Sequence, residues 1–368
     1  MVVYEPNASH YELLSDIGKA CDGAATVYLA QHTPSSTFVA VRKTDLESDK
    51  ASFANLQHEF HLMRLLQHEH LLCCHCAFVV ANELWEVMPL MDYGSAQDIV
   101  AANFPDGLGE LSIAYILRDV LTALDYIHKM GFIHRSIKSS HILLSQNGRI
   151  LMTGLSTAVN MVKDGQRLRA VHDFPTHAVK NLPWLAPEIL EQNLLGYDTR
   201  SDIYSIGITA CELANGCIPF SDMVSTKMLL EKINGTTPKL LDATTLGEEQ
   251  LMSQADSGID TGMVGNSASS SRHSSNPYTR VFSSQFHQFV DICLLRDPSE
   301  RPSAAALLTH PFFKQVKKRT SELLTSVLQY LKPITQTEQL LKKVTRPDVR
   351  DTAQQLQEMD VTDNWVFD

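Results

Sequence analysis

The sequence predicts an α+β chain in two lobes, a small β-rich lobe followed by a larger helical lobe. Up to about residue 88, short runs rich in Val, Tyr and Thr alternate with polar turns, which is typical of strands. After Pro89, apolar residues recur at three-to-four spacing over long stretches, which indicates helices. The length of 368 residues, with 44% apolar and 20% charged residues, is that of a globular chain with a well-buried core.

The first lobe is expected over residues 10–88 as a small antiparallel sheet with one helix. The helix is predicted over residues 51–66, where Leu56, Phe60 and Met63 share one apolar face. The strands are predicted over residues 11–17, 26–31, 38–42, 71–80 and 84–88.

The second lobe is expected over residues 89–313. Its helices are predicted over residues 111–130, 201–215, 227–233, 286–296 and 304–308. A Ser-rich insert over residues 243–280 has almost no aromatic residues, so we expect it to be disordered. A C-terminal tail, residues 314–368, begins with an amphipathic run over 314–331 and ends with two aromatic residues, Trp365 and Phe367.

Charge and cysteine content restrict the class of partner and the compartment. The 31 basic and 42 acidic residues give a net charge of −11, which argues against a nucleic-acid-binding protein. No stretch approaches the roughly 18 apolar residues that a membrane helix needs, so we expect no membrane insertion. The 7 scattered cysteines and the absence of a signal-like start favour a reduced compartment, cytosolic or nuclear. We expect a cytoplasmic protein that can shuttle to the nucleus.

One local cluster resembles a metal site at first sight. Cys73, Cys74, His75 and Cys76 are consecutive, and successive side chains of a strand point to opposite faces, so four of them cannot face one ion. We therefore expect buried thiols on the fourth strand rather than metal ligands.

Four short strings in a fixed order resemble the protein-kinase signature set of V-A-I-K, H-R-D, D-F-G and A-P-E. The strings lie at residues 39–42, 134–136, 154–156 and 186–188. Three anchors strengthen the resemblance: Glu59 stands where the helix C glutamate is expected, residues 202–207 resemble the D-x-W-S-x-G helix, and Arg301 is expected to pair with Glu188. The resemblance covers residues 10–313 and implies a two-lobed protein-kinase-like fold.

The chemical positions of this pattern are degenerate. Phosphoryl transfer needs a group that accepts the substrate proton, side chains that hold the metal ions, and a lysine on the phosphates. Here Ser136 replaces the aspartate of H-R-D, and a hydroxyl is no base near neutral pH. His141 replaces the metal-binding asparagine, Gly154 replaces the aspartate of D-F-G, and Arg42 replaces the lysine. We therefore expect a pseudokinase without catalytic residues.

The glycine-rich loop is altered as well. Gly18 is kept, Ala20 replaces the second glycine, and Val27 lies two residues later than the pattern expects. An active kinase in which Lys19 or Lys43 replaces the missing lysine is the rival interpretation, although it leaves Ser136 and Gly154 unexplained.

Among pseudokinases, the chain resembles the sterile-20-related adaptor (STRAD) family. The strings that carry the resemblance are H-R-S-I-K-S-S-H-I-L-L at 134–144, G-L-S at 154–156, V-H-D-F-P at 171–175, P-W-L-A-P-E-I-L at 183–190 and the block 200–216. The resemblance implies an adaptor that binds and allosterically activates a Ser/Thr kinase of the liver kinase B1 type. It also implies a helical-repeat scaffold, mouse protein 25 (calcium-binding protein 39), which receives a terminal Trp-Glu-Phe motif.

The tail keeps part of that motif. Trp365 and Phe367 have the spacing of the two aromatics, but Val366 replaces the acid and Asp368 adds a residue. We expect the two aromatics to dock on the scaffold, with folding back on their own domain as the alternative. In the activation segment, Val171, His172 and Phe174 are expected to contact the partner kinase, with a loop of no special role as the alternative.

ATP is the expected cofactor, bound without catalysis and with little dependence on magnesium. The residues expected to bind it are Gly18, Lys19, Val27, Ala40, Arg42, Glu59, Met88, Leu90, Met91, Lys138 and Leu143. Arg135 is expected either to bind a phosphorylated residue such as Thr176 or to brace the fold, and these alternatives stay open. A passive scaffold that binds nucleotide without changing its partner's activity is the alternative to the allosteric adaptor.

Overall fold

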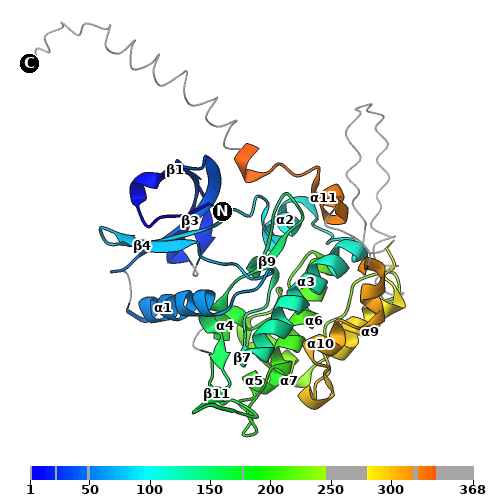
Figure 1. Ribbon diagram of the computed structural model, residues 1–368. Helices are drawn as coiled ribbons and strands as arrows, with labels where there is room; N and C mark the ends of the chain where they lie inside the picture. The colour runs from blue at the N-terminus through cyan, green and yellow to red at the C-terminus, as the bar shows by residue number, and fades with distance from the viewer. Residues whose placement is uncertain are drawn as a thin grey trace, which may run out of the picture.

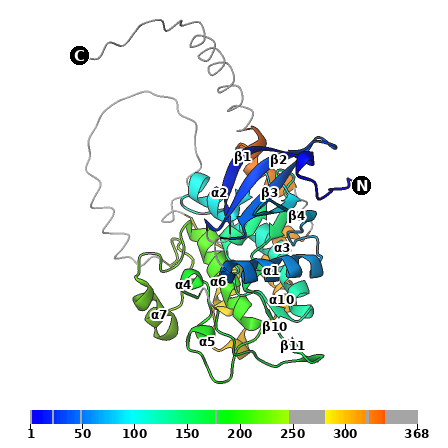
Figure 2. The same ribbon diagram turned by 90° about the vertical axis from the view of Figure 1, so that its left-hand side faces the viewer.

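The two predicted lobes are both present in the computed structural model, which describes residues 2–20, 23–47, 50–175, 178–245, 280–317 and 322–336. The first lobe is a five-stranded antiparallel sheet in the order β1-β2-β3-β5-β4, with helix α1 beside it (Figures 1 and 2). Its elements are β1 (Tyr11–Ala20), β2 (Ala25–His32), β3 (Thr37–Asp45), α1 (Lys50–Leu65), β4 (Cys76–Val80) and β5 (Glu83–Pro89).

The predicted strand over residues 71–80 is wrong in its first half. Strand β4 starts at Cys76, whereas Leu71 makes an isolated parallel bridge to Met152 of the second lobe. The backbone N–H of Leu72 donates to the carbonyl of Met152 at 2.9 Å. The apolar residues before Cys76 therefore connect the lobes instead of extending the sheet.

The second lobe is mostly helical, as predicted. Its helices are α2 (Ala96–Asn103), α3 (Glu110–Lys129), α4 (Ala178–Asn181), α5 (Pro187–Leu190), α6 (Arg200–Asn215), α7 (Ser225–Asn234), α9 (Ser284–Cys293), α10 (Ala304–Leu307) and α11 (Glu322–Leu328). Its short strands are β6 (Gly94–Ser95), β7 (Phe132–Ile133), β8 (Ile142–Leu144), β9 (Ile150–Met152), β10 (Val159–Asn160), β11 (Val162–Lys163) and β12 (Gln166–Arg167).

Helices α3 and α6 form the centre of this lobe. Leu117, Leu121 and Leu124 of α3 and Ile206 of α6 are fully buried. Most residues of both helices are buried, so other elements cover them on several sides. This packing gives the loops at their ends a rigid base.

The C-terminal segment lies against the second lobe and reaches the edge of the cleft. The amphipathic run predicted over residues 314–331 is divided between a 3-10 helix (Pro311–Val316) and α11, whose Leu324 and Leu328 are buried and which packs on α3. Beyond α11 the orange segment in Figure 1 runs toward the sheet, and the N–H of Ile334 donates to the carbonyl of Asp92 at 2.9 Å. Most of the Ser-rich insert, the Thr176 position, Trp365 and Phe367 lie outside the described residues.

None of the helices in the described residues combines the length and the apolar character that crossing a bilayer requires.

Candidate functional site

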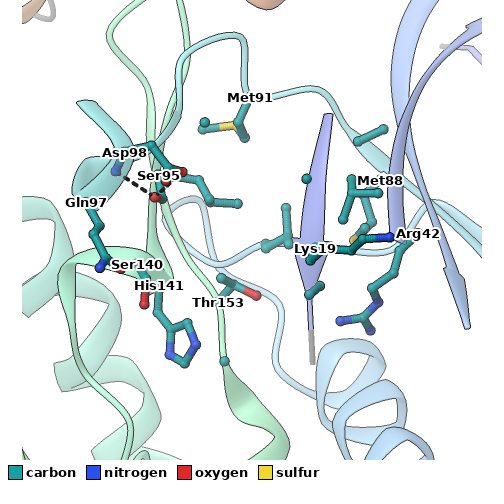
Figure 3. A pocket seen from close by; sticks show the side chains of 18 of the residues that line it. Lys19, Arg42, Met88, Met91, Ser95, Gln97, Asp98, Ser140, His141 and Thr153 are labelled. Atoms are coloured by element: carbon teal, nitrogen blue, oxygen red, sulfur yellow. Dashed lines mark hydrogen bonds between the residues drawn. The ribbon is translucent and has the colours of Figure 1, made fainter. Parts of the chain in front are cut away.

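A cleft of about 480 Å³ separates the two lobes. All eleven residues that the sequence assigns to nucleotide binding border it, together with Ser136, His141 and Gly154. Figure 3 shows Arg42 directed toward helix α1 on one side, Met88 and Met91 at the connection between the lobes, and His141 on the opposite side. The structure therefore brings the predicted residues together in one place.

The loop between β1 and β2 covers the cleft without a run of glycines. Gly18 pairs with Val27 and Ala20 with Ala25, so the two strands stay paired close to the turn. The ammonium group of Lys19 donates to the Thr26 hydroxyl at 2.7 Å and lies 3.9 Å from the Asp16 carboxylate. Both contacts of the Lys19 ammonium group are therefore with residues of its own hairpin, on the exposed side.

Arg42 is buried and held between two carboxylates. Its Nη1 donates at 2.9 Å to Glu59 of α1, the residue in the position of the helix C glutamate. Its Nε and Nη2 donate to the two oxygens of Glu86 on β5, at 2.6 and 2.9 Å. Such bidentate, charge-assisted contacts are strong and geometrically specific.

A second contact holds α1 to the other lobe. The imidazole Nε2 of His58 lies 2.8 Å from the carbonyl oxygen of Ala158, just after the Gly154-Leu155-Ser156 string. Since a carbonyl only accepts hydrogen bonds, the ring donates. Helix α1 is thus tied to β3, to β5 and to the start of the activation segment.

The loop that follows β7 is anchored by Asp202, the first residue of the string that resembles the D-x-W-S-x-G helix. The Asp202 carboxylate accepts the backbone N–H groups of His134 and Arg135, each at 2.8 Å, and lies 2.8 Å from Nε2 of His128. These contacts hold Ser136 beside the cleft, almost fully buried. A serine hydroxyl in that place can donate or accept a hydrogen bond but is not a useful proton acceptor.

His141 fills the space where metal ligands are expected in a kinase. Its Nδ1 lies 2.7 Å from the carbonyl oxygen of Ser136, so this nitrogen carries the proton and donates. Gly154 has a left-handed backbone, φ +89°, and a Cβ added there would lie 2.6 Å from Cε1 of His141. The imidazole and a side chain at residue 154 exclude one another.

Neither Lys19, described above, nor Lys43 takes the position of the Arg42 side chain. Lys43 lies on the opposite face of β3, because neighbouring residues of a strand alternate. Its ammonium group contacts Glu83 at 2.6 Å and lies 5.0 Å from the centre of the Trp85 ring. Lys138 borders the cleft and donates to the amide oxygen of Asn181 at 3.1 Å.

Arg135 holds the activation segment through several hydrogen bonds. The Nη1 group of Arg135 donates to the Asp173 carboxylate at 2.6 Å and to the Tyr197 hydroxyl at 2.9 Å, while Nε donates to the carbonyl of Thr157 at 2.6 Å. The Tyr197 hydroxyl donates to the carbonyl of Asp173 at 2.5 Å. Of the two alternatives for Arg135, these contacts favour bracing the fold.

The three residues predicted to contact a partner differ in exposure. His172 is exposed, and Phe174 is 43% exposed beside a hollow of about 220 Å³ that also includes Leu194. For Val171 the prediction of a surface contact is wrong, because its side chain is 6% exposed. Val171 pairs with Tyr197 in an antiparallel bridge and packs into the core beneath the segment.

Two further predictions concern buried side chains. Arg301 donates to both carboxylate oxygens of Glu188, at 2.6 and 2.9 Å, which confirms the expected pair. The expectation of buried thiols on the fourth strand is wrong for Cys73 and Cys74, which precede β4. Cys73, Cys74 and Cys76 are all half-buried, so the expectation of burial is wrong for Cys76 as well, although Cys76 begins β4.

Sequence reasoning missed three residues of the site. Glu86 follows Trp85 in an apolar strand, and nothing in that pattern marks its contact with Arg42. Ile334 borders the cleft from the C-terminal segment, and Asp173 holds Arg135. Alternation along β5 would have placed Glu86 beside Arg42 only once the pairing of β3 with β5 was known.

A two-lobed kinase fold with Ser136, His141 and Gly154 at the base and metal-ligand positions defines the class of protein as a pseudokinase. The family model described as protein kinase domain matches residues 11–313. STE20-related kinase adapter proteins of the alpha and beta types are 42% to 51% identical to this chain and are matched over at least 80% of their own length, so the chain belongs to this family.

Two adapters of the alpha type are about half identical to the chain. STE20-related kinase adapter protein alpha of Gallus gallus is 51% identical over 90% of this chain and 87% of the relative. The human (Homo sapiens) alpha protein is 49% identical over 91% of this chain and 80% of the relative. The human beta protein is 42% identical over 90% of this chain and 82% of the relative.

Proposed function

We propose that this chain is a catalytically inactive adapter that binds a Ser/Thr kinase of the liver kinase B1 type and activates it allosterically. The observation that carries the proposal is the combination of an ordered activation segment with degenerate chemical positions. Arg135, Asp173 and Tyr197 hold the segment, whereas Ser136 and Gly154 supply neither a base nor a carboxylate ligand. A kinase that keeps the active-like shape but not the chemistry is suited to binding rather than to catalysis.

The partner is expected to contact the exposed side of the activation segment. Phe174 and Leu194 face one hollow, and Leu194 is 94% exposed. Exposed apolar side chains beside a hollow are typical of protein contact surfaces. Contacts made only with the active conformation of the partner supply the coupling free energy, typically about 1–3 kcal/mol.

The C-terminal tail supplies a second interaction in this proposal. Trp365 and Phe367, separated by Val366, dock on the scaffold mouse protein 25 and place the adapter, its partner kinase and the scaffold in one ternary complex. The adapter is expected in the cytoplasm, with shuttling to the nucleus. Similarity to named kinase adapters supports the adapter role, and the spacing of the two aromatics supports the docking.

ATP occupies the cleft in the same proposal, without being hydrolysed. Met88, Leu90 and Met91 line the connection between the lobes, where an adenine ring would bind. Since Gly154 and His141 provide no carboxylate or amide ligand for magnesium, binding is expected to depend little on this ion. Thermal unfolding with millimolar ATP, with and without magnesium, tests this, and the absence of any shift removes nucleotide from the proposal.

Reconstitution of the partner kinase tests the activation. We expect the wild-type chain to raise the partner's phosphorylation rate, Phe174→Ala to reduce this effect, and truncation before Trp365 to reduce the contribution of the scaffold. Val281→Ala, which shortens another exposed side chain, is the matched control and should behave like wild type. If all variants bind the partner and none, including wild type, changes its rate, the chain is a passive scaffold.

Absence of phosphoryl transfer is tested separately. Purified protein with labelled ATP should transfer no γ-phosphate to itself or to a generic substrate. Transfer that disappears on Lys19→Ala or Lys43→Ala would establish the rival, an active kinase.

A further inference from the structure

Arg42 has two carboxylate neighbours, Glu59 and Glu86, and therefore one more negatively charged partner than a simple ion pair with Glu59 would have. The guanidinium, with one positive charge, lies between two carboxylates that both accept charge-assisted hydrogen bonds from it. Glu86 is fully buried, and Arg42 and Glu59 are nearly so. The three side chains therefore form a buried group with a surplus of negative charge.

Glu86 lies on the side of Arg42 that is away from the cleft. Arg42 and Glu59 border the cleft, whereas Glu86 is not among the described residues that do so. The bidentate contact with Nε and Nη2 draws the guanidinium toward β5. In an active kinase, the basic side chain at this position binds the nucleotide phosphates and the helix C glutamate.

Cys74 lies near this buried group of charges. Burial raises the pKa of Cys74 to about 12, and the negative charge of Glu86 contributes to this rise. An uncharged thiol beside Glu86 leaves the carboxylate with Arg42 as its cationic partner.

We propose that Glu86 takes the place of a phosphate group as the second anionic partner of Arg42, so that the inner end of the cleft disfavours phosphate and α1 is held without nucleotide. The inference rests on the proposed binding of nucleotide in this cleft and specifies its ligand class. The cleft selects the nucleoside part of its ligand, and the triphosphate adds little to the affinity.

The preference for a nucleoside over a triphosphate follows from competition between the carboxylates and the phosphates for the Arg42 guanidinium. A triphosphate entering the cleft meets a cation whose hydrogen-bond donors already face two carboxylates, and its own charge is repelled by the surplus. Neutral adenosine meets no such repulsion. Glu86→Gln keeps the size and an amide oxygen for Arg42 but removes the charge.

Affinities of ATP and adenosine, measured by calorimetry on the full chain without magnesium, test the proposal. We expect Glu86→Gln to raise ATP affinity relative to adenosine affinity by at least about tenfold, because one buried negative charge is removed. Glu83→Gln is the matched control: Glu83 lies on the same strand and contacts Lys43 on the other face, so the ratio should stay at the wild-type value. If Glu86→Gln does not fold, Glu86→Leu removes the same charge with similar bulk.

The outcomes separate the two proposals. If adenosine binds and the ratio of ATP affinity to adenosine affinity is unchanged or lower in Glu86→Gln, the role of Glu86 is wrong while nucleotide binding stands. If wild type binds neither ligand but Glu86→Gln binds ATP, the role of Glu86 is supported. If no protein binds either ligand, nucleotide binding fails and the inference fails with it.

Discussion

The imidazole ring of His141 occupies the space into which a side chain at Gly154 would project. The two substitutions at the metal-ligand positions are therefore physically coupled. A bulky ring at 141 requires the absence of a side chain at 154, and the left-handed backbone of Gly154 favours glycine independently.

Replacing Gly154 is expected to cost more than its backbone conformation alone explains. Gly154→Ala should lower the free energy of unfolding by about 2–4 kcal/mol, from backbone strain and overlap with His141. Gly165→Ala is the control, because Gly165 has φ +74° but open space around a Cβ, so only the strain applies.

Urea unfolding of the double variant Gly154→Ala/His141→Ala measures the coupling. We expect the additional cost of Gly154→Ala to disappear when the ring is absent, leaving a cost similar to that of Gly165→Ala. Equal costs of Gly154→Ala with and without His141 would contradict the coupling. By the same reasoning, Gly154→Asp alone restores no magnesium site.

Asp173 is expected to hold the activation segment in place. Asp173→Asn should increase tryptic cleavage at Arg167 and Arg169, because it removes the charge that Arg135 contacts at 2.6 Å. The global free energy of unfolding should change by less than about 1 kcal/mol, since the Asp173 side chain is 60% exposed. Asp164→Asn in the same segment is the control, and identical cleavage rates in both variants would show that Asp173 has no such role.

Lys232 makes stability depend on pH. Burial, the largest cause, lowers the pKa of Lys232 to about 7, although the charge of Glu188 acts in the opposite direction. The ammonium group lies 2.7 Å from the carbonyl of Pro183 and 4.6 Å from the centre of the Tyr204 ring. Between this value and the ordinary pKa of 10.5, the unfolded chain binds a proton that the folded chain does not.

The stability of the wild type relative to Lys232→Met should therefore rise with pH from about 7 to 10, by up to about 1.4 kcal/mol per pH unit. Below pH 7 both states bind the proton and the difference should be constant. Lys227→Met, at an exposed position of the same helix, should show a flat difference. A flat difference for Lys232→Met as well would mean that its ammonium stays charged in the folded protein.

Ile334 is expected to contribute to ligand binding from outside the kinase-like region. Ile334→Ala should weaken adenosine binding about 3- to 10-fold, because the side chain borders the cleft and its shortening exposes the bound ring to water. Tyr330→Ala, which alters an 84% exposed side chain of the same segment, should leave the affinity unchanged. Calorimetry of both variants tests this. An adenosine affinity of Ile334→Ala equal to that of the wild type would show that Ile334 does not belong to the site.

Motifs made the cleft predictable, because residues of fixed roles recur in a fixed order. The eleven cleft residues and the Arg301–Glu188 pair followed from that order, and the structure brings them together. Val171 was misplaced because exposure depends on the bridge with Tyr197. The strand before Cys76 was misplaced because its apolar residues pack between the lobes.

By itself the sequence determined the class of fold and the loss of the base and metal-ligand side chains, because these depend on which residue types occupy ordered positions. The tertiary structure decided which charges meet. Arg42 and Glu86 are 44 residues apart, and Arg135 and Asp173 are 38 residues apart. Such contacts depend on strand pairing and loop paths, and a local pattern of residues carries neither.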